Sequence, residues 1–540
     1  MDKRLLFVLP LALAACGEAE RLNPEPADVA LAVHWEACAE GPGSCASIEV
    51  PLDWNAPGDE TLPFFVRRIP TAEPVSKGQL WLLEGGPGAA GWGFVEVAAI
   101  FQSIAPGYDL YLPDYRGTGN SSWLGCEDRG YAFETDPDCM AALLARHGED
   151  LRHYDTTSAA LDIGNTIEAI RGAGERVYVY GVSYGTFAVN RYLTLFPDQA
   201  DGAILDSVCP PTGCDVMMDR NFVEVARFVF EGCAADPLCG EKLGDDPWGK
   251  LLDLLGRLEA GHCEAFLGYP SNRIVLEQLV GYATNDAFTA AVATSAVHRL
   301  GRCDEADVAA LDNLVDWMRN GMGAGFGPGA GSGAAFSPYL SDHVVFSEFW
   351  PEGLDRETAE EILAELPFQT GALLSWVEAK DRWSFPPSHT PDSLYAWAPT
   401  ETPLLLLNGD LDGQTPIDAI RDAEAAFVNE AQHLVEVPLA NHGVLATSAF
   451  TAEREDFTCG MEIAAAFLAD PQGAPKTGCI DRIPGFDFAG PPGLAAALYG
   501  TADLWENDAA QGIHIAPALR PAQERALTSL REKLQGPLRF

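Results

Sequence analysis

The segment from Val177 to Gly185 constrains this chain more than any other feature. A run of β-branched and aromatic residues ends in Gly-x-Ser-x-Gly centred on Ser183, and helix-compatible residues 186–196 follow. This order predicts a strand, a sharp turn and a helix, with the serine hydroxyl exposed above the strand end. Small residues at Gly181 and Gly185 let the strand and helix approach that closely. The same motif also occurs by chance as a plain turn before a buried helix, so its meaning depends on the rest of the chain.

Strands and helices alternate on both sides of this segment. An opening antiparallel pair is expected at residues 47–52 and 62–69, joined by a turn-forming stretch at 55–59. Further strands are expected at 80–84, 109–112, 203–205, 403–408 and 433–437, and helices at 157–171, 186–196, 417–427 and 461–468. This alternation predicts an α/β fold built on a mostly parallel, doubly wound sheet.

The strand pattern stops between the strands at 203–205 and 403–408. Residues 209–399 are mostly helix-compatible, so we expect a large, mainly helical cap inserted between two core strands. Its Gly/Ala-rich stretch at 321–335 is either a plain surface loop or a mobile lid element. The core would then comprise residues 35–208 and 400–485, and residues 486–540 form a C-terminal tail without an assignable motif.

The N-terminus has the composition of a targeting segment. Lys3 and Arg4 precede an apolar stretch, and the small residues Ala14 and Ala15 precede Cys16. Residues 1–15 are therefore expected to be a signal peptide. The ending resembles a bacterial lipobox, which implies lipidation of Cys16, a tether over residues 16–34, and an exported protein anchored to a membrane of the cell envelope without spanning it. An ordinary secretion signal with an incidental cysteine is the alternative.

The cysteine count agrees with export. The chain has 13 cysteines, and setting Cys16 aside leaves an even number. Pairing of neighbours would give Cys38 with Cys45, Cys126 with Cys139, Cys209 with Cys214, Cys233 with Cys239, Cys263 with Cys303, and Cys459 with Cys479, although spacing does not determine connectivity. No Cys-x-x-Cys or Cys/His cluster indicates a metal site. Disulfides formed in an oxidising compartment are the better interpretation.

The formal net charge of −45 excludes nucleic acid as a partner recognised through its phosphates. The acidic residues are spread through the whole chain, which favours a well-hydrated, soluble surface. Attraction of cationic substrates, such as peptides with a free amino terminus, is the sharper interpretation of the same charge.

Three polar side chains follow expected strand ends, where open α/β sheets place their sites. Ser183 follows one strand, Asp412 lies four residues beyond another, and His442 follows the last. A serine needs a base to become a nucleophile, and His442 would be that base. Asp412 would fix the imidazole tautomer and stabilise the imidazolium. Backbone amides of Gly85, Gly86 and Tyr184 would bind the oxyanion of the tetrahedral intermediate.

Some of these assignments have competitors. Asp410 competes with Asp412 for the role of acid, and it could instead cap or turn the loop. His433 and His389 are the histidines nearest to His442 in sequence and compete with it for the role of base. However, His433 opens a strand and His389 lies in the insertion. Asp114 and Arg116 could form an ion pair in a binding site, but a structural role, with Arg116 bracing the loops around the active edge, is expected.

Taken together, the motifs resemble the prolyl aminopeptidase and tripeptidyl aminopeptidase branch of the α/β-hydrolases. The order Ser…Asp…His is the one found in that fold. The matching segments, over roughly residues 35 to 485, are Val50 to Trp54, Gly85 to Gly88, Asp114 to Ser121, Gly181 to Thr186, Gly409 to Pro416, Asn441 to Gly443, and Cys459 with Cys479. The Asp-x-Arg-Gly-x-Gly-x-Ser segment also occurs in epoxide hydrolases and dehalogenases, but those enzymes use an aspartate nucleophile, and the turn at residue 183 carries a serine instead.

The resemblance implies an α/β-hydrolase fold and an exported serine exopeptidase that acts on free peptide N-termini, whereas some relatives are esterases. Acidic cap groups that bind the substrate amine in relatives cannot be matched to residues here. Glu84 departs from the histidine or small polar residue frequent before Gly-Gly-Pro-Gly; its carboxylate either bonds the loop or faces the substrate amine. No metal or organic cofactor is implied. A small-ester carboxylesterase, or a binding protein on an inactive scaffold, are the competing hypotheses.

Overall fold

The protein is built around one nine-stranded sheet with the strand order β1-β2-β3-β5-β4-β6-β7-β8-β9. The computed structural model describes residues 29–58, 60–126, 135–266, 271–320, 336–388, 390–451, 454–491 and 493–508, together with residues 527 and 531. The strands are β1 (Glu36–Ala37), β2 (Ser44–Pro51), β3 (Thr61–Ile69), β4 (Gly78–Leu83), β5 (Tyr108–Asp114), β6 (Arg176–Val182), β7 (Gly202–Asp206), β8 (Leu404–Gly409) and β9 (Gln432–Val437). A small second sheet pairs β10 (Phe450–Thr451) with β11 (Arg454–Thr458).

The directions of the strands determine which edge of the sheet collects their carboxyl ends. β2 and β3 form the expected antiparallel pair, and β3 is antiparallel to β5. The pairings from β5 through β4, β6, β7 and β8 to β9 are all parallel. The carboxyl ends of these six strands therefore lie along a single edge of the sheet. The expected α/β class with a mostly parallel sheet is confirmed.

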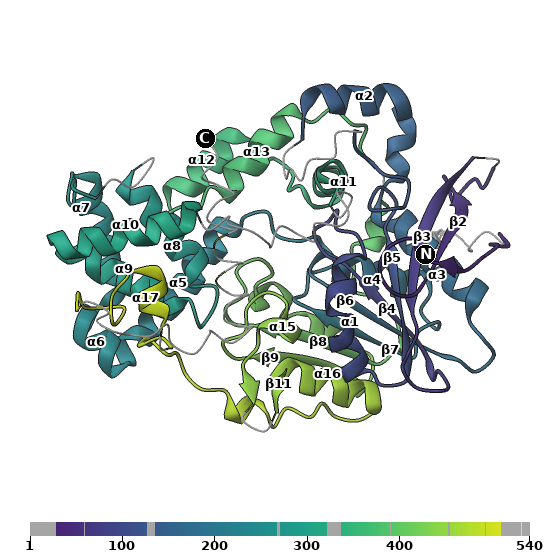
Figure 1. Ribbon diagram of the computed structural model, residues 1–540. Helices are drawn as coiled ribbons and strands as arrows, with labels where there is room; N and C mark the ends of the chain where they lie inside the picture. The colour runs from purple at the N-terminus through teal and green to yellow at the C-terminus, as the bar shows by residue number, and fades with distance from the viewer. Residues whose placement is uncertain are drawn as a thin grey trace, which may run out of the picture.

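Helices cover both faces of the sheet (Figure 1). One face packs against α1 (Gly93–Ile104) and α16 (Cys459–Ala469), and the other against α3 (Thr156–Ile170) and α4 (Tyr184–Leu195). Alternate residues of β4 serve the two faces, because side chains alternate along a strand: Leu80 and Leu82 belong to the first core, and Trp81 and Leu83 to the second. Shorter elements of the core are α2 (Pro137–His147), η1 (Gly148–His153), η4 (Ile417–Ile420), α14 (Ala423–Ala426), α15 (Val444–Thr447) and η5 (Ile480–Arg482).

The expected helix over residues 417–427 is wrong as a single element. The chain forms a 3₁₀ turn, η4, followed by the one-turn helix α14. The buried side chains here are Ile417, Ile420 and Ala423, which recur every third residue. That spacing matches the three residues per turn of a 3₁₀ helix and not the 3.6 of an α-helix.

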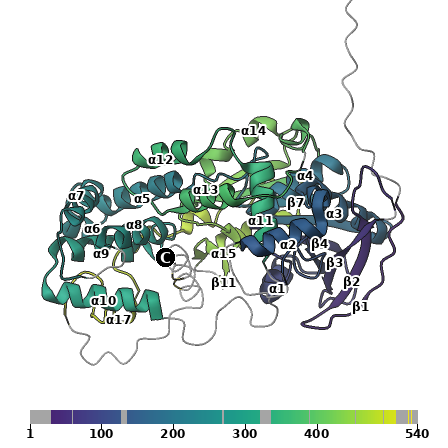
Figure 2. The same ribbon diagram turned by 90° about the horizontal axis from the view of Figure 1, so that it is seen from above.

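Between β7 and β8 the chain leaves the sheet and forms helices. These are α5 (Met218–Ala235), α6 (Pro237–Leu243), α7 (Pro247–Glu259), α8 (Asn272–Ala283), α9 (Ala290–Arg302), α10 (Glu305–Asn320), α11 (Pro338–Val344), the π-helical turn η2 (Val345–Phe349), α12 (Arg356–Ala364), α13 (Ala372–Arg382) and η3 (Asp392–Leu394). Helices α5 to α10 share a hydrophobic core of their own. Figures 1 and 2 show them gathered at one end of the molecule, beside the sheet.

The second half of the insertion docks on α3 and α4, the helix that follows the turn carrying Ser183. Glu348 in η2 accepts hydrogen bonds from the Thr156 amide (2.9 Å) and hydroxyl (2.8 Å) at the start of α3, and lies 3.5 Å from the Arg191 guanidinium on α4. Both charged side chains are fully buried. Phe349 packs edge-on against Phe187 of α4. This part of the insertion is thereby joined to the helix that follows Ser183.

The C-terminal segment returns to the helical insertion. After η5 the chain runs to α17 (Leu494–Leu498), whose Leu494 and Leu498 belong to the hydrophobic core of α5 to α10. Trp505 is buried in the same core and donates from its indole nitrogen to the Phe488 carbonyl at 2.8 Å. Figure 1 shows α17 in yellow among the teal helices. Residues 486–491 and 493–508, for which the sequence offers no motif, thus complete the core of this helical unit.

Among the described residues, six disulfides link neighbouring cysteines. They join Cys38 to Cys45, Cys126 to Cys139, Cys209 to Cys214, Cys233 to Cys239, Cys263 to Cys303, and Cys459 to Cys479. These are the pairs suggested by neighbourhood in the sequence. Several predicted features lie outside the described residues: the signal peptide at 1–15, Cys16, residues 16–28 of the tether, the Gly/Ala-rich stretch at 321–335, His389, and residues 509–540 of the C-terminal tail apart from 527 and 531. Within the described part of the chain, no helix combines the length and apolarity needed to cross a bilayer.

Candidate active site

Ser183 lies between β6 and α4 in a strained backbone conformation. Its φ of 57° and ψ of −129° lie outside the usual regions for a residue with a side chain. A Cβ on Gly181 would collide with the carbonyl of Gly185, and one on Gly185 would collide with the carbonyl of Leu83. Strand and helix therefore meet as closely as the sequence motif predicts. The turn leaves Ser183 partly exposed at the carboxyl end of β6.

His442 and Asp412 meet in the loops that follow β9 and β8. Nδ1 of His442 lies 3.0 Å from each carboxylate oxygen of Asp412. The carboxylate also accepts from the Gln414 and Thr415 amides, both at 2.9 Å, and from the Thr415 hydroxyl at 2.7 Å. Burial opposes ionisation of Asp412, but His442 and the Thr415 donors hold the pKa of its carboxyl below the usual range. The pair therefore has an ionised acid that orients the imidazole.

The competing residues take other positions. Asp410 accepts a hydrogen bond from the Leu439 amide at 2.6 Å, so it fastens two loops together, and burial raises the pKa of its carboxyl to about 6. His433 is paired in register with Leu405 near the start of β9, at the opposite end of the strand from His442. Among the described residues, Asp412 is the carboxylate that His442 contacts.

A short hydrogen-bonded chain holds the serine turn and the histidine loop together. The Ser183 amide donates to the Asp206 carbonyl at the end of β7 (3.0 Å). The Asp206 carboxylate accepts the amides of Val444 and Leu445 (2.7 and 3.1 Å), and the neighbouring Ser207 hydroxyl accepts the Gly443 amide (2.7 Å). Asp206 and Ser207 were not singled out from the sequence, although they directly follow the expected strand at 203–205.

The turn after β4 lies directly beside Ser183. A Cβ on Gly85 would lie 2.9 Å from the Cβ of Ser183. The Gly85 amide donates to the Glu84 carboxylate at 3.3 Å, so Glu84 takes the loop-bonding role considered from the sequence. In the described residues the amides of Gly86 and Tyr184 have no intramolecular acceptor. Of the three expected oxyanion donors, these two are the ones free to bind a substrate oxygen.

Asp114 and Arg116 do not pair with each other. The buried Arg116 forms an ion pair with Asp162 (2.6 Å) and donates to the carbonyls of Leu52 and His153 (3.0 and 2.7 Å). Asp114 accepts the Gly91 amide at 2.9 Å and the Asn120 amide at 2.8 Å. Both residues therefore brace loops near the active edge, as expected of a structural role.

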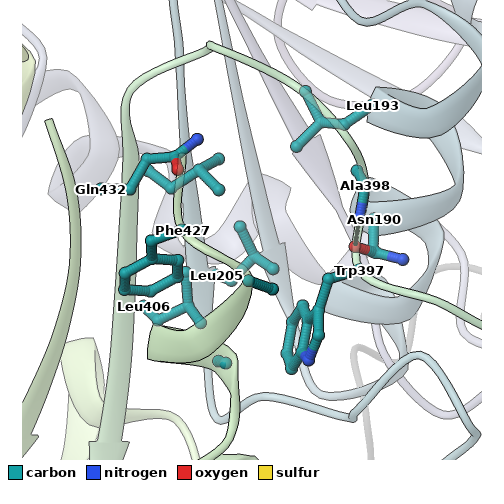
Figure 3. A pocket seen from close by; sticks show the side chains of 11 residues that line it. Asn190, Leu193, Leu205, Trp397, Ala398, Leu406, Phe427 and Gln432 are labelled. Atoms are coloured by element: carbon teal, nitrogen blue, oxygen red, sulfur yellow. Dashed lines mark hydrogen bonds between the residues drawn. The ribbon is translucent and has the colours of Figure 1, made fainter. Parts of the chain in front are cut away.

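A small cavity lies on the α4 face of the sheet, away from Ser183. Its volume is about 10 Å³, enough for about one water molecule. Figure 3 shows Leu205, Phe427 and Trp397 around it, and Leu404 and Gln432, at the amino ends of β8 and β9, also line it. It is a packing void and not part of the arrangement around Ser183.

Comparison with known proteins agrees with this topology. A family model described as the alpha/beta hydrolase fold matches residues 80–239. That match spans β4, the serine turn, α4, β7 and the first helix of the insertion. Together with the parallel sheet and the position of Ser183 after β6, it identifies the fold of the core.

Curated relatives of this chain are aminopeptidases. A tripeptidyl aminopeptidase of Streptomyces lividans is 30% identical over 228 residues, which cover 36% of this chain and 42% of that protein. A proline iminopeptidase of Aspergillus aculeatus is 29% identical over 167 residues, covering 30% of this chain and 36% of that protein. The match thus spans about two fifths of the length of the first relative. A solved proline iminopeptidase of Mycobacterium smegmatis aligns over 79% of this chain and 98% of its own, at 15% identity and a TM-score of 0.33. The chain has the α/β-hydrolase fold and resembles the aminopeptidases of that fold.

Proposed function

We propose that the protein is a serine hydrolase that releases residues or short peptides from free peptide N-termini. The observation that carries this proposal is the His442–Asp412 pair at the carboxyl edge of the sheet that also presents the strained Ser183. The names of the similar aminopeptidases support a peptide as the substrate.

Each residue has a defined step. Ser183 Oγ attacks the scissile carbonyl carbon while its proton passes to Nε2 of His442, because Asp412 occupies Nδ1. The amides of Gly86 and Tyr184 stabilise the oxyanion. The C–N bond then breaks, and the proton moves from His442 to the leaving amine. Water attacks the acyl-enzyme by the same route and frees the carboxylic acid and Ser183. Transfer of the proton requires Ser183 Oγ and His442 Nε2 to lie within hydrogen-bond distance in the complex with substrate.

A carboxylesterase with the same three residues is the second candidate, because both reactions pass through an acyl-enzyme. The two differ in what the helical insertion recognises. We would offer the protein starting after Cys16 a tripeptide chromogenic amide with a free amino terminus, its N-acetylated form, and a short-chain chromogenic ester. Cleavage of the free-amine peptide alone supports the aminopeptidase. Ester turnover with neither peptide cleaved assigns a carboxylesterase.

The serine assignment has its own test. Ser183→Ala should abolish turnover of whichever substrate is cleaved and leave the melting temperature unchanged or raised, because alanine removes the nucleophile only. Thr194→Ala is the matched control and should retain activity. It removes a hydroxyl from the same helix, α4, that donates only to the Asn190 carbonyl among the described residues. Turnover by folded Ser183→Ala at more than a small residual rate contradicts the assignment.

We also propose that the protein is exported and anchored to the cell envelope through lipidated Cys16. Six disulfides support an oxidising compartment. Cells producing the full chain would be fed a clickable fatty acid. Labelling that is lost in Cys16→Ser, together with release of the protein from the membrane fraction, is the expected result. Equal labelling of both proteins contradicts the anchor.

A further inference from the structure

The loop that carries the catalytic acid is completed by a residue of the helical insertion. We define this acid loop as residues 410–416. The Asp412 carboxylate itself accepts the amides of Gln414 and Thr415. The Gly413 amide, which directly precedes them in the chain, donates to the side-chain oxygen of Asn285 at 3.1 Å. Three consecutive amides of the acid loop thus donate hydrogen bonds. Two of them donate to Asp412 within the loop, and one donates to Asn285 outside it.

Asn285 is held so that only an amide side chain fits. It lies in the turn between α8 and α9 and is 3% exposed. Its Nδ2 donates to the Gly281 carbonyl on α8, and its Oδ1 accepts from Gly413. One side must therefore be a donor and the other an acceptor. An aspartate would place an oxygen against the Gly281 carbonyl, and an aliphatic residue would leave the buried Gly413 amide unpaired.

Gly413 also packs closely against the helical insertion. A Cβ on Gly413 would collide with Asn285 and with the ring of Phe222 from α5. No side chain therefore fits between the insertion and Gly413, which directly follows Asp412 in the chain. Since Asp412 orients His442 through Nδ1, a displacement of this loop changes the alignment of the base.

We propose that Asn285 is a positioning residue for the catalytic acid, so that docking of the helical insertion on the acid loop is required for an aligned Ser183–His442–Asp412 triad. The insertion then serves the chemistry directly, in addition to any contact with substrate. This inference rests on the proposed function only in its use of the triad, and it holds equally for a peptidase or an esterase.

The test compares Asn285→Leu with Thr289→Val. The first removes the acceptor of the Gly413 amide at nearly constant volume. The second removes a hydroxyl that donates to the Ala283 carbonyl (2.8 Å) in the same turn and that has no hydrogen bond to the acid loop among the described residues. Asn285→Leu should lower kcat by about 10- to 100-fold, as expected for a sub-ångström to ångström misplacement, with little change in KM. Thr289→Val should keep wild-type kcat. Should Asn285→Leu fail to fold, Asn285→Ser, whose hydroxyl is too short to reach Gly413, is expected to behave in the same way.

A second substrate separates positioning from substrate binding. The loss should be the same on the free-amine tripeptide and on a short-chain ester that extends little beyond the reacting carbonyl, because misalignment of Asp412 and His442 affects every substrate. Loss on the peptide alone, equal loss in Thr289→Val, or an unchanged kcat in folded Asn285→Leu would each overturn the proposal. If the wild type cleaves only the ester, the aminopeptidase assignment fails while this test remains valid on the ester.

Discussion

Replacing Glu84 by glutamine should stabilise the folded protein at alkaline pH and have little effect near pH 4.5. Burial beside the turn that follows β4 raises the pKa of Glu84 to about 7, the Gly85 amide opposes that rise, and the negative charge of Asp114 adds to it. The folded protein therefore binds this proton more tightly than the unfolded chain between pH 4.5 and 7. Its free energy of unfolding falls as pH rises through that window.

The size of the effect follows from the two pKa values. The rise from 4.5 to about 7 corresponds to ~3 kcal/mol, at about 1.4 kcal/mol for each tenfold change in proton affinity. Solvent reaches part of the side chain, so we expect about 2–3 kcal/mol. Glutamine keeps an oxygen that can accept the Gly85 amide hydrogen bond, so the difference isolates the cost of ionisation.

The measurement is urea-induced unfolding, followed by tryptophan fluorescence with the disulfides intact, of wild type and Glu84→Gln at pH 4.5 and pH 8. The difference in unfolding free energy between the two proteins should grow by about 2–3 kcal/mol from the lower pH to the higher. Glu96→Gln, at an exposed position on the neighbouring helix α1, is the matched control. Its difference in unfolding free energy from wild type should be the same at both pH values. If the difference in unfolding free energy between Glu84→Gln and wild type is also the same at both pH values, the reasoning is refuted.

Three other perturbations test the site and the helical insertion. Asp412→Asn should lower kcat by ~10⁴ at neutral pH with no loss of folding, because an amide no longer fixes the His442 tautomer; a loss under tenfold would contradict the role of the acid. Trp505→Ala should destabilise the insertion by ~3–5 kcal/mol, seen as a lower unfolding midpoint, because it empties the buried site that α17 closes; an unchanged midpoint would mean that the C-terminal segment adds no stability. Replacing both Cys263 and Cys303 by serine opens a 40-residue loop and should cost about 4 kcal/mol by the chain-entropy estimate, whereas no change in the urea midpoint would contradict it.

The sequence was most informative where contacts are local. The strand, turn and helix around Ser183 are encoded by neighbouring residues, and the close approach of Gly181 to Gly185 matches the motif. The buried strands are continuous apolar runs, so their positions were predicted to within a few residues. Disulfide partners close in sequence were likewise suggested by their spacing.

The expected helix at 417–427 failed for a tertiary reason. Its alanine, arginine and glutamate residues are good helix formers. The spacing of the positions that pack on the sheet nevertheless favours a 3₁₀ turn followed by a single helical turn. Burial against neighbouring elements overrides such weak local preferences.

What the sequence by itself determined is therefore the α/β class, the serine turn and the candidate acid and base, because each depends on a short pattern with a direct physical meaning. Tertiary structure alone decided that Asn285 completes the acid loop, that Asp206 joins the serine turn to the histidine loop, and that residues 486–508 fill the core of a helical unit begun more than two hundred residues earlier. Such contacts join residues far apart in the chain. No local periodicity records them, because the partner of a buried amide or an apolar side chain is set only when the chain folds.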